Sequence, residues 1–175
     1  MGLDHSALGE KITRITEDVF TTMLAMDLKH LSTTVESGDV GNSGGVAALI
    51  GFAGRWVGTG CISCSSTLAC EIAGTMLMAP YDNVCDDVLD AAGEIANMVI
   101  GNIKNELEEI VGPLGLSIPT VVYGRNFATR SLSKNEWTSV AFDCAGQKLL
   151  VQVMLAENRT PPTSHHAFSL AHQVI

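Results

Sequence analysis

The sequence predicts an α+β fold with two pseudo-repeated halves, in which long helices pack on an antiparallel β-sheet. Two segments of helical length, 8–31 and 86–111, carry apolar residues at steps of three and four. Shorter runs rich in β-branched residues follow each of them, separated by turns that contain glycine. The resulting order is helix, strands, helix, helix, strands, so that the second half repeats the first.

In the first half, the amphipathic segment 8–31 is predicted to form one long helix and 32–37 a short strand. Glycines in 38–45 then break the helical period. Two further strands, 46–53 and 56–63, are expected to join near Gly54. The apolar positions that define the helix are Leu8, Ile12, Ile15, Val19, Met23 and Met26.

The second half is predicted to begin with a short helix after the N-cap candidates Ser65, Ser66 and Thr67, and this helix ends near Met78 because Pro80 cannot continue it. The long helix 86–111 stops at the Gly-Pro pair that follows. The remaining strands are expected at 116–124, 136–144 and 148–156, the last two forming a hairpin about Ala145, Gly146 and Gln147.

Composition indicates a globular chain: of 175 residues, 46% are hydrophobic and 17% charged, with a net charge of −9. We expect a single domain over 1–175, with a core of about 8–155 and a tail of 156–175. The acidic balance and the absence of basic clusters argue against nucleic acid or an anionic membrane as partner. No apolar run approaches a membrane span, and 1–22 contains no apolar signal segment, so we expect a cytoplasmic protein.

The five cysteines show no framework spacing, and a reducing compartment is expected. The one C-x-x-C pair, Cys61 and Cys64, lies in a predicted strand, where positions three apart point to opposite faces. We therefore interpret both as structural. The histidines His165, His166 and His172 lie in the tail, which is interpreted as a solvated or swapped segment rather than a metal site.

One polar row stands out on the long helix. At about 100° per residue, Glu94 and Asn97 point within about 40° of Asp90. A polar helix face is usually only solvated, but Asn is a mediocre helix former and sits mid-helix here. Gly101 continues the row and leaves a bare patch beside Asn97. From spacing alone, a solvated face and a functional face remain equally good interpretations.

These residues resemble the CheC/CheX/FliY family of chemotaxis phosphatases, whose signature D/S-x3-E-x2-N matches Asp90, Glu94 and Asn97. The flanks "STLACEIAGTMLMAP" and "LGLSIPTVVYG" are also similar to the family, and the resemblance spans roughly 12–155. In the first helix the matching positions are Thr13, Glu17 and Phe20, which lack the amide. The chain therefore resembles the one-site CheX branch.

The resemblance implies hydrolysis of the phosphoaspartate of a CheY-type receiver domain. Asn97 would orient the attacking water, Glu94 would face the receiver's active-site lysine, and Asp90 and Gly101 would contact the partner. Mg²⁺ would be held by the receiver, with no metal or cofactor on this chain. The resemblance also implies a homodimer, and the apolar segment 149–155 is expected to be an edge strand that pairing covers.

Two alternatives remain open. One is a non-catalytic receiver-binding or flagellar-switch-like adaptor on the same fold, which the intact Glu94 and Asn97 pair disfavours. The other is an enzyme with a nucleophilic Cys or Ser, although the sequence contains no G-x-S-x-G, P-loop or H-E-x-x-H motif.

Overall fold

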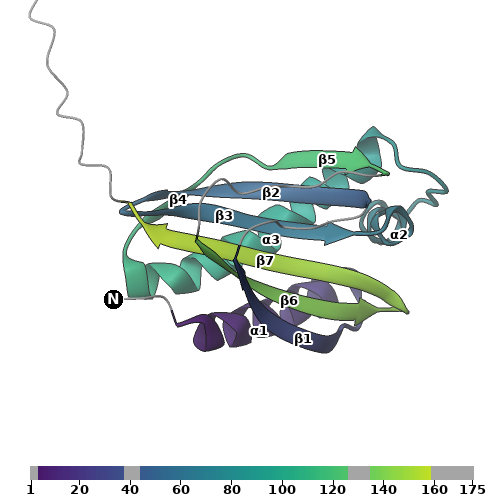
Figure 1. Cartoon of the computed structure of the whole chain (residues 1–175). Coiled ribbons are helices and arrows are strands. Elements are labelled where there is room, and N and C mark those ends of the chain that lie inside the picture. Colours follow the sequence, from purple (N-terminus) through teal and green to yellow (C-terminus); the bar gives the residue numbers. More distant parts are fainter. Residues whose placement is uncertain (1–3, 38–43, 126–134, 159–175) are drawn as a thin grey trace, which may run out of the picture.

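The computed structural model describes residues 4–37, 44–125 and 135–158. Within this part, seven strands form one sheet whose order is β1-β6-β7-β3-β2-β4, with β5 also paired to β2, and all pairings are antiparallel (Figure 1). The predicted α+β class is therefore confirmed. The strands are β1 (Lys29–Ser37), β2 (Gly45–Gly54), β3 (Trp56–Cys64), β4 (Leu114–Leu116), β5 (Thr120–Gly124), β6 (Glu136–Cys144) and β7 (Gln147–Glu157).

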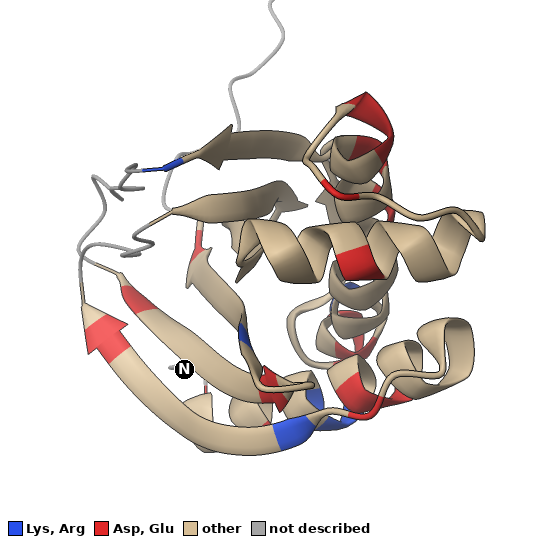
Figure 2. Ribbon diagram, turned by 90° about the vertical axis from the view of Figure 1, so that its right-hand side faces the viewer, with Lys and Arg blue, Asp and Glu red and all other residues tan. Residues whose placement is uncertain are grey.

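Two long helices pack behind the sheet in the view of Figure 1, α1 (His5–Leu24) behind β6 and α3 (Asp86–Val111) behind the central strands. The shorter α2 (Ser66–Leu77) packs against α3. In the perpendicular view the sheet lies to the left and α2 and α3 to the right (Figure 2). Alternate residues of β2 point into the core that these helices cover, namely Val46, Ala48, Ile50 and Phe52.

Several predicted boundaries are confirmed. The side-chain oxygen of Ser65 accepts a hydrogen bond from the Leu68 backbone N–H at 3.1 Å and caps α2, which ends where Met78 adopts a left-handed conformation (φ 52°). The helix 86–111 has the predicted ends. Ala145 and Gly146 both have positive φ, 51° and 82°, as the tight turn between β6 and β7 requires.

The predicted helix 8–31 was too long. Helix α1 ends at Leu24 because Ala25 turns left-handed (φ 50°), and β1 begins at Lys29. Met26 still packs against the core without being helical, which is why the apolar period appeared to continue. Beyond it, antiparallel pairing with β6 satisfies the backbone of β1, and this tertiary pairing overrides the local helical pattern.

Two strand predictions also need correction. The segment 116–124 is not one strand, because Ser117–Pro119 separates β4 from β5 and Pro119 has no N–H for a ladder. The segment 149–155 is not an edge strand, since β7 lies between β6 and β3. The sheet ends instead at β1 on one side and at β4 and β5 on the other.

A carboxylate on α3 connects the two long helices. Glu106 accepts a hydrogen bond from Lys11 Nζ at 2.9 Å and another from the guanidinium of Arg14, both on α1. The hydrogen bond from Arg14, followed by that from Lys11, lowers the pKa of Glu106. The side chains of Glu106 and Lys11 are only 26% and 28% exposed, so solvent screens this pair incompletely.

We predict that Glu106→Gln lowers the free energy of unfolding at pH 7 by about 1 kcal/mol. A carboxyl whose pKa is lowered by folding stabilises above its unfolded pKa of roughly 4.3, and this contribution is lost as the pH falls through the lower folded pKa. Urea unfolding at pH 7 and pH 3 should therefore show a larger deficit at pH 7 than at pH 3. The exposed Glu109→Gln on the same helix is the control, and an equal deficit there would contradict the assignment.

Candidate functional site on helix α3

One face of α3 is buried against the sheet and the neighbouring helices. Its contact with β3 is close: a Cβ added to Gly60 would stand 2.7 Å from Ile100 Cδ1 and 2.9 Å from its Cγ2. Only glycine at this position lets the helix lie so near the strand. The buried α3 side chains are Val88, Ala91, Ile95, Ala96, Val99, Ile100, Ile103, Leu107 and Val111.

The opposite face presents the three signature residues together. Asp90, Glu94 and Asn97 are all exposed, as predicted. None of their three side chains makes a hydrogen bond or ion pair within the described residues 4–37, 44–125 and 135–158. Two carboxylates and one amide thus stand free on successive turns of a helix that the core holds in place.

The C-terminal half of the same polar row is occupied. Lys104 Nζ lies 2.8 Å from Glu108 Oε2, and the other carboxylate oxygen of Glu108 accepts the Leu114 backbone N–H at 2.8 Å. The backbone hydrogen bond and then Lys104 lower the pKa of Glu108. These residues fix the chain where it leaves α3 for β4, so their role is structural.

Gly101 marks the boundary between the two halves. It is half-buried, and a Cβ added there would find Leu116 Cδ1 at 4.0 Å as its nearest neighbour, so the space beside Asn97 is open. Ile110, in the last turn of α3, is 63% exposed.

The β4–β5 connection passes along the same row. Pro119 Cβ lies 3.7 Å from where a Gly93 Cβ would stand, and Leu116 approaches Gly101 on the other side of Asn97. Ile118 lies between Leu116 and Pro119 and is 85% exposed. The prediction of a single strand over 116–124 did not identify Ile118 as an exposed residue. Pro119 was the signal in the sequence that this strand is interrupted.

The matching face of α1 does not carry an equivalent row. Phe20, which stands at the amide position, is buried in the core, while Thr13 and Glu17 are half-buried. Thr13 and Glu17 line a groove of about 380 Å³ between α1 and β1. Helix α1 therefore lacks both the amide and the exposed geometry of α3.

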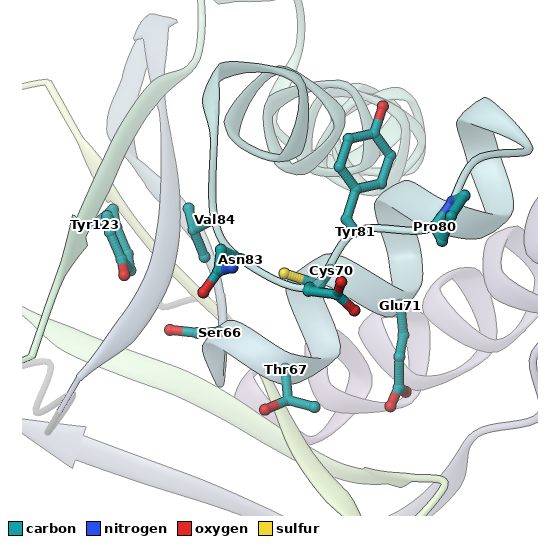
Figure 3. A pocket seen from close by; sticks show the side chains of 11 residues that line it. Ser66, Thr67, Cys70, Glu71, Pro80, Tyr81, Asn83, Val84 and Tyr123 are labelled. Carbon is teal, nitrogen blue, oxygen red and sulfur yellow. The ribbon is translucent and has the colours of Figure 1, made fainter.

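A cavity of about 500 Å³ lies between α2, the loop before α3 and β5 (Figure 3). The loop is tied to α3 because Tyr81 Oη donates to Asp87 Oδ2 at 3.0 Å. None of the three signature residues lines the cavity. Its residues are Ser66, Thr67, Cys70, Glu71, Gly74, Pro80, Tyr81, Asp82, Asn83, Val84 and Tyr123.

The cysteines do not form a reactive group. Burial raises the pKa of both Cys61 and Cys64 to about 12, and burial also raises the pKa of Cys70 and Cys144. Cys61 and Cys64 pack in different clusters, as expected for opposite faces of β3. All five thiols are free, and only Cys85 is exposed.

No group of three or more His, Cys, Asp or Glu side chains among the described residues is arranged to hold a metal ion. None of the described helices is both long and apolar enough to cross a membrane. The histidines His165, His166 and His172 lie outside the described residues.

Solved structures share the fold of helices packed on an antiparallel sheet. The structure of the chemotaxis protein CheX from Vibrio vulnificus superposes with a TM-score of 0.77 at 24% identity, covering 86% of this chain and 99% of that one. A CheX–CheY–BeF3–Mg²⁺ complex from Borrelia burgdorferi contains a chain with a TM-score of 0.69 at 21% identity, covering 89% and 100%. These likenesses establish the fold.

The sequence establishes the family. Residues 46–143 match the family model described as chemotaxis phosphatase CheX, and the chain belongs to this family. The CheY-P phosphatase CheX of Thermotoga maritima is 31% identical over 87 residues, which are 49% of this chain and 56% of the relative. The match thus spans about half the length of that curated relative, and the family match includes the whole of α3.

We predict that a thiol reagent at pH 8 labels Cys85 at least about a hundredfold faster than Cys61 or Cys64 in the folded protein, because their raised pKa values keep the thiols protonated. Mass spectrometry of timed samples measures the sites, with Cys85→Ser and urea-unfolded protein as controls. Rapid labelling of Cys61 and Cys64, or a disulfide between them, would contradict the structural interpretation and favour a redox role for the pair.

Proposed function

We propose that this chain is a phosphatase that hydrolyses the phosphoaspartate of a CheY-type receiver domain, with α3 supplying half of the active site. The observation that carries the proposal is the free and exposed state of Glu94 and Asn97, on a helix whose other polar-row residues, Lys104 and Glu108, are paired. Membership of the CheX family and the name of the Thermotoga relative support the same reaction.

Asn97 suits the task of orienting water. An acyl phosphate is already reactive, so placing a water in line with phosphorus is most of what a catalyst must add. The amide oxygen can accept a hydrogen bond from that water while the NH2 group donates elsewhere. Because the amide is neutral, it adds no repulsion against the phosphoryl oxygens.

Glu94 suits a different contact. A carboxylate aimed at the phosphoryl group would repel it, so the favourable partner is a cation on the receiver, which we assign to its active-site lysine. Asp90, one turn earlier on the same row, would orient the docked surfaces. The resulting charge-assisted contact would set the position of Asn97 over the phosphoryl group.

The divalent cation of the reaction is assigned to the partner. Mg²⁺ prefers clustered carboxylate and phosphoryl oxygens. Asp90 and Glu94 lie on one helix row without a third ligand group among the described residues. The Borrelia complex contains CheY and Mg²⁺ together with CheX, which supports the same composition for the complex proposed here.

We also infer a homodimer, as the family resemblance implied, although strand β7 cannot form its interface because it is internal. The edge strand β1 is exposed along its whole length and carries the exposed apolar residues Leu31 and Val35. An exposed edge of this kind favours pairing with a second chain. Sedimentation of the purified protein measures the state.

We predict that Asn97→Ala lowers kcat by at least about a hundredfold with little loss of receiver binding, because it removes only the group that places the water. Glu94→Ala should weaken binding and turnover together by about tenfold or more, because it removes a charge-assisted contact. Decay of a ³²P-labelled receiver gives turnover, and binding to a beryllofluoride-treated receiver gives affinity.

The controls are Asn102→Ala and Glu109→Ala, which remove an exposed amide and an exposed carboxylate from other faces of the same helix. Full turnover by Asn97→Ala would show that another group orients the water. Tight receiver binding with no accelerated decay by the wild type would instead favour the adaptor alternative.

Gly101→Ala offers a separate test of the bare patch. The added methyl meets nothing closer than 4.0 Å, and replacing a mid-helix glycine should raise the free energy of unfolding by about 0.5–1 kcal/mol. If the receiver packs against this patch, its affinity should fall several-fold while the protein becomes more stable. Thermal unfolding and receiver binding measure the two effects, and unchanged affinity would remove Gly101 from the interface.

A further inference from the structure

We infer that Ile118 is a docking anchor for the receiver domain, an apolar contact beside the catalytic row that contributes to affinity and partner choice. This inference rests on the proposed function and deepens it by adding a specificity-determining residue from outside α3. The sequence signature contains only helix residues, and none of them is apolar.

The first support is position. Leu116 and Pro119 flank Ile118 and approach α3 at Gly101 and Gly93, which lie four residues to either side of Asn97. The connection therefore runs beside α3 past the level of Asn97, and the exposed Ile118 lies in its middle. A domain placed over Asn97 would also cover Ile118.

The second support is rigidity. The Ser117 backbone N–H donates to Gly51 O at 2.9 Å, and Ser117 Oγ accepts from Gly51 N–H at 2.8 Å, so the residue before Ile118 is held to β2 from two sides. Ser117 Oγ also donates to Ile118 O at 2.9 Å. Pro119 restricts the backbone of Ile118 to extended conformations. An anchor held in this way loses little conformational entropy on binding.

The third support is the contrast between Ile118 and its surroundings. At 85% exposure it is almost fully solvated, whereas the flanking Leu116 and Pro119 are half-buried. On α3, residues 86–103 contain the acids Asp86, Asp87, Asp90 and Glu94 and no Lys or Arg. An acidic helix can attract and orient the lysine-bearing face of a receiver, and a rigid apolar neighbour can supply the buried contact that charges alone lack.

The test compares Ile118→Ala with Ile110→Ala, since Ile110 is also exposed but lies on another face of α3. We expect Ile118→Ala to raise the Kd for a beryllofluoride-treated CheY-type receiver, and the KM of dephosphorylation, by about tenfold. At saturating receiver, kcat should stay within about twofold of wild type. Ile118→Val should recover most of the affinity, and Ile110→Ala should match wild type throughout.

The outcomes separate the two proposals. If the wild type is active and Ile118→Ala has an unchanged Kd and KM, the proposed docking role of Ile118 is overturned and the proposed phosphatase function is not. A loss of kcat instead of affinity would also overturn it, because Ile118 would then act on the chemistry. Wild type that neither binds nor dephosphorylates the receiver would overturn both. Because Ile118 is solvated, its truncation should leave the unfolding midpoint unchanged, which circular dichroism checks.

Discussion

The burial of one face of α3 is the constraint on which the proposed site depends. A helix buried along one side can neither rotate nor slide without exposing apolar surface, and each lost side chain costs about 1.5–3 kcal/mol. The close contact between Gly60 and Ile100 fixes the helix against β3 as well. The direction of Asn97 is therefore set by core packing, and the side chain needs no polar neighbour to hold its helix in place.

Four acidic residues of α3 form two groups that differ in their partners. Glu106 and Glu108 have partners in the chain, and these contacts hold α3 to α1 and to the start of β4. Asp90 and Glu94 have no such partner among the described residues. The carboxylates that pair with Lys or Arg lie toward the C-terminal end, so the charges of Asp90 and Glu94 give the first half of the helix a negative potential that can act on an approaching partner.

The sequence pattern correctly predicted those elements that depend on hydrophobic periodicity and local backbone preference. Helix α3, the cap at Ser65 and the turn at Ala145 follow from periodicity and backbone preference, and all three were predicted. One error lies where tertiary pairing decides: residues 29–31 belong to β1 and not to the predicted helix, because this strand pairs with β6. The other is the single strand predicted across Ile118, which overlooked the local break at Pro119. The exposure of Asn97 was predictable from the helix period, but the unpaired state of its neighbours was not.

The two long helices divide the work between structure and site. On α1, Phe20 is buried where an amide would be needed, and Lys11 and Arg14 are used to hold Glu106 of α3. A second site on α1 would require an exposed amide at the position where Phe20 fills the core, so core packing favours one site per chain. Of the two long helices, α1 thus supports the fold and α3 carries the proposed site.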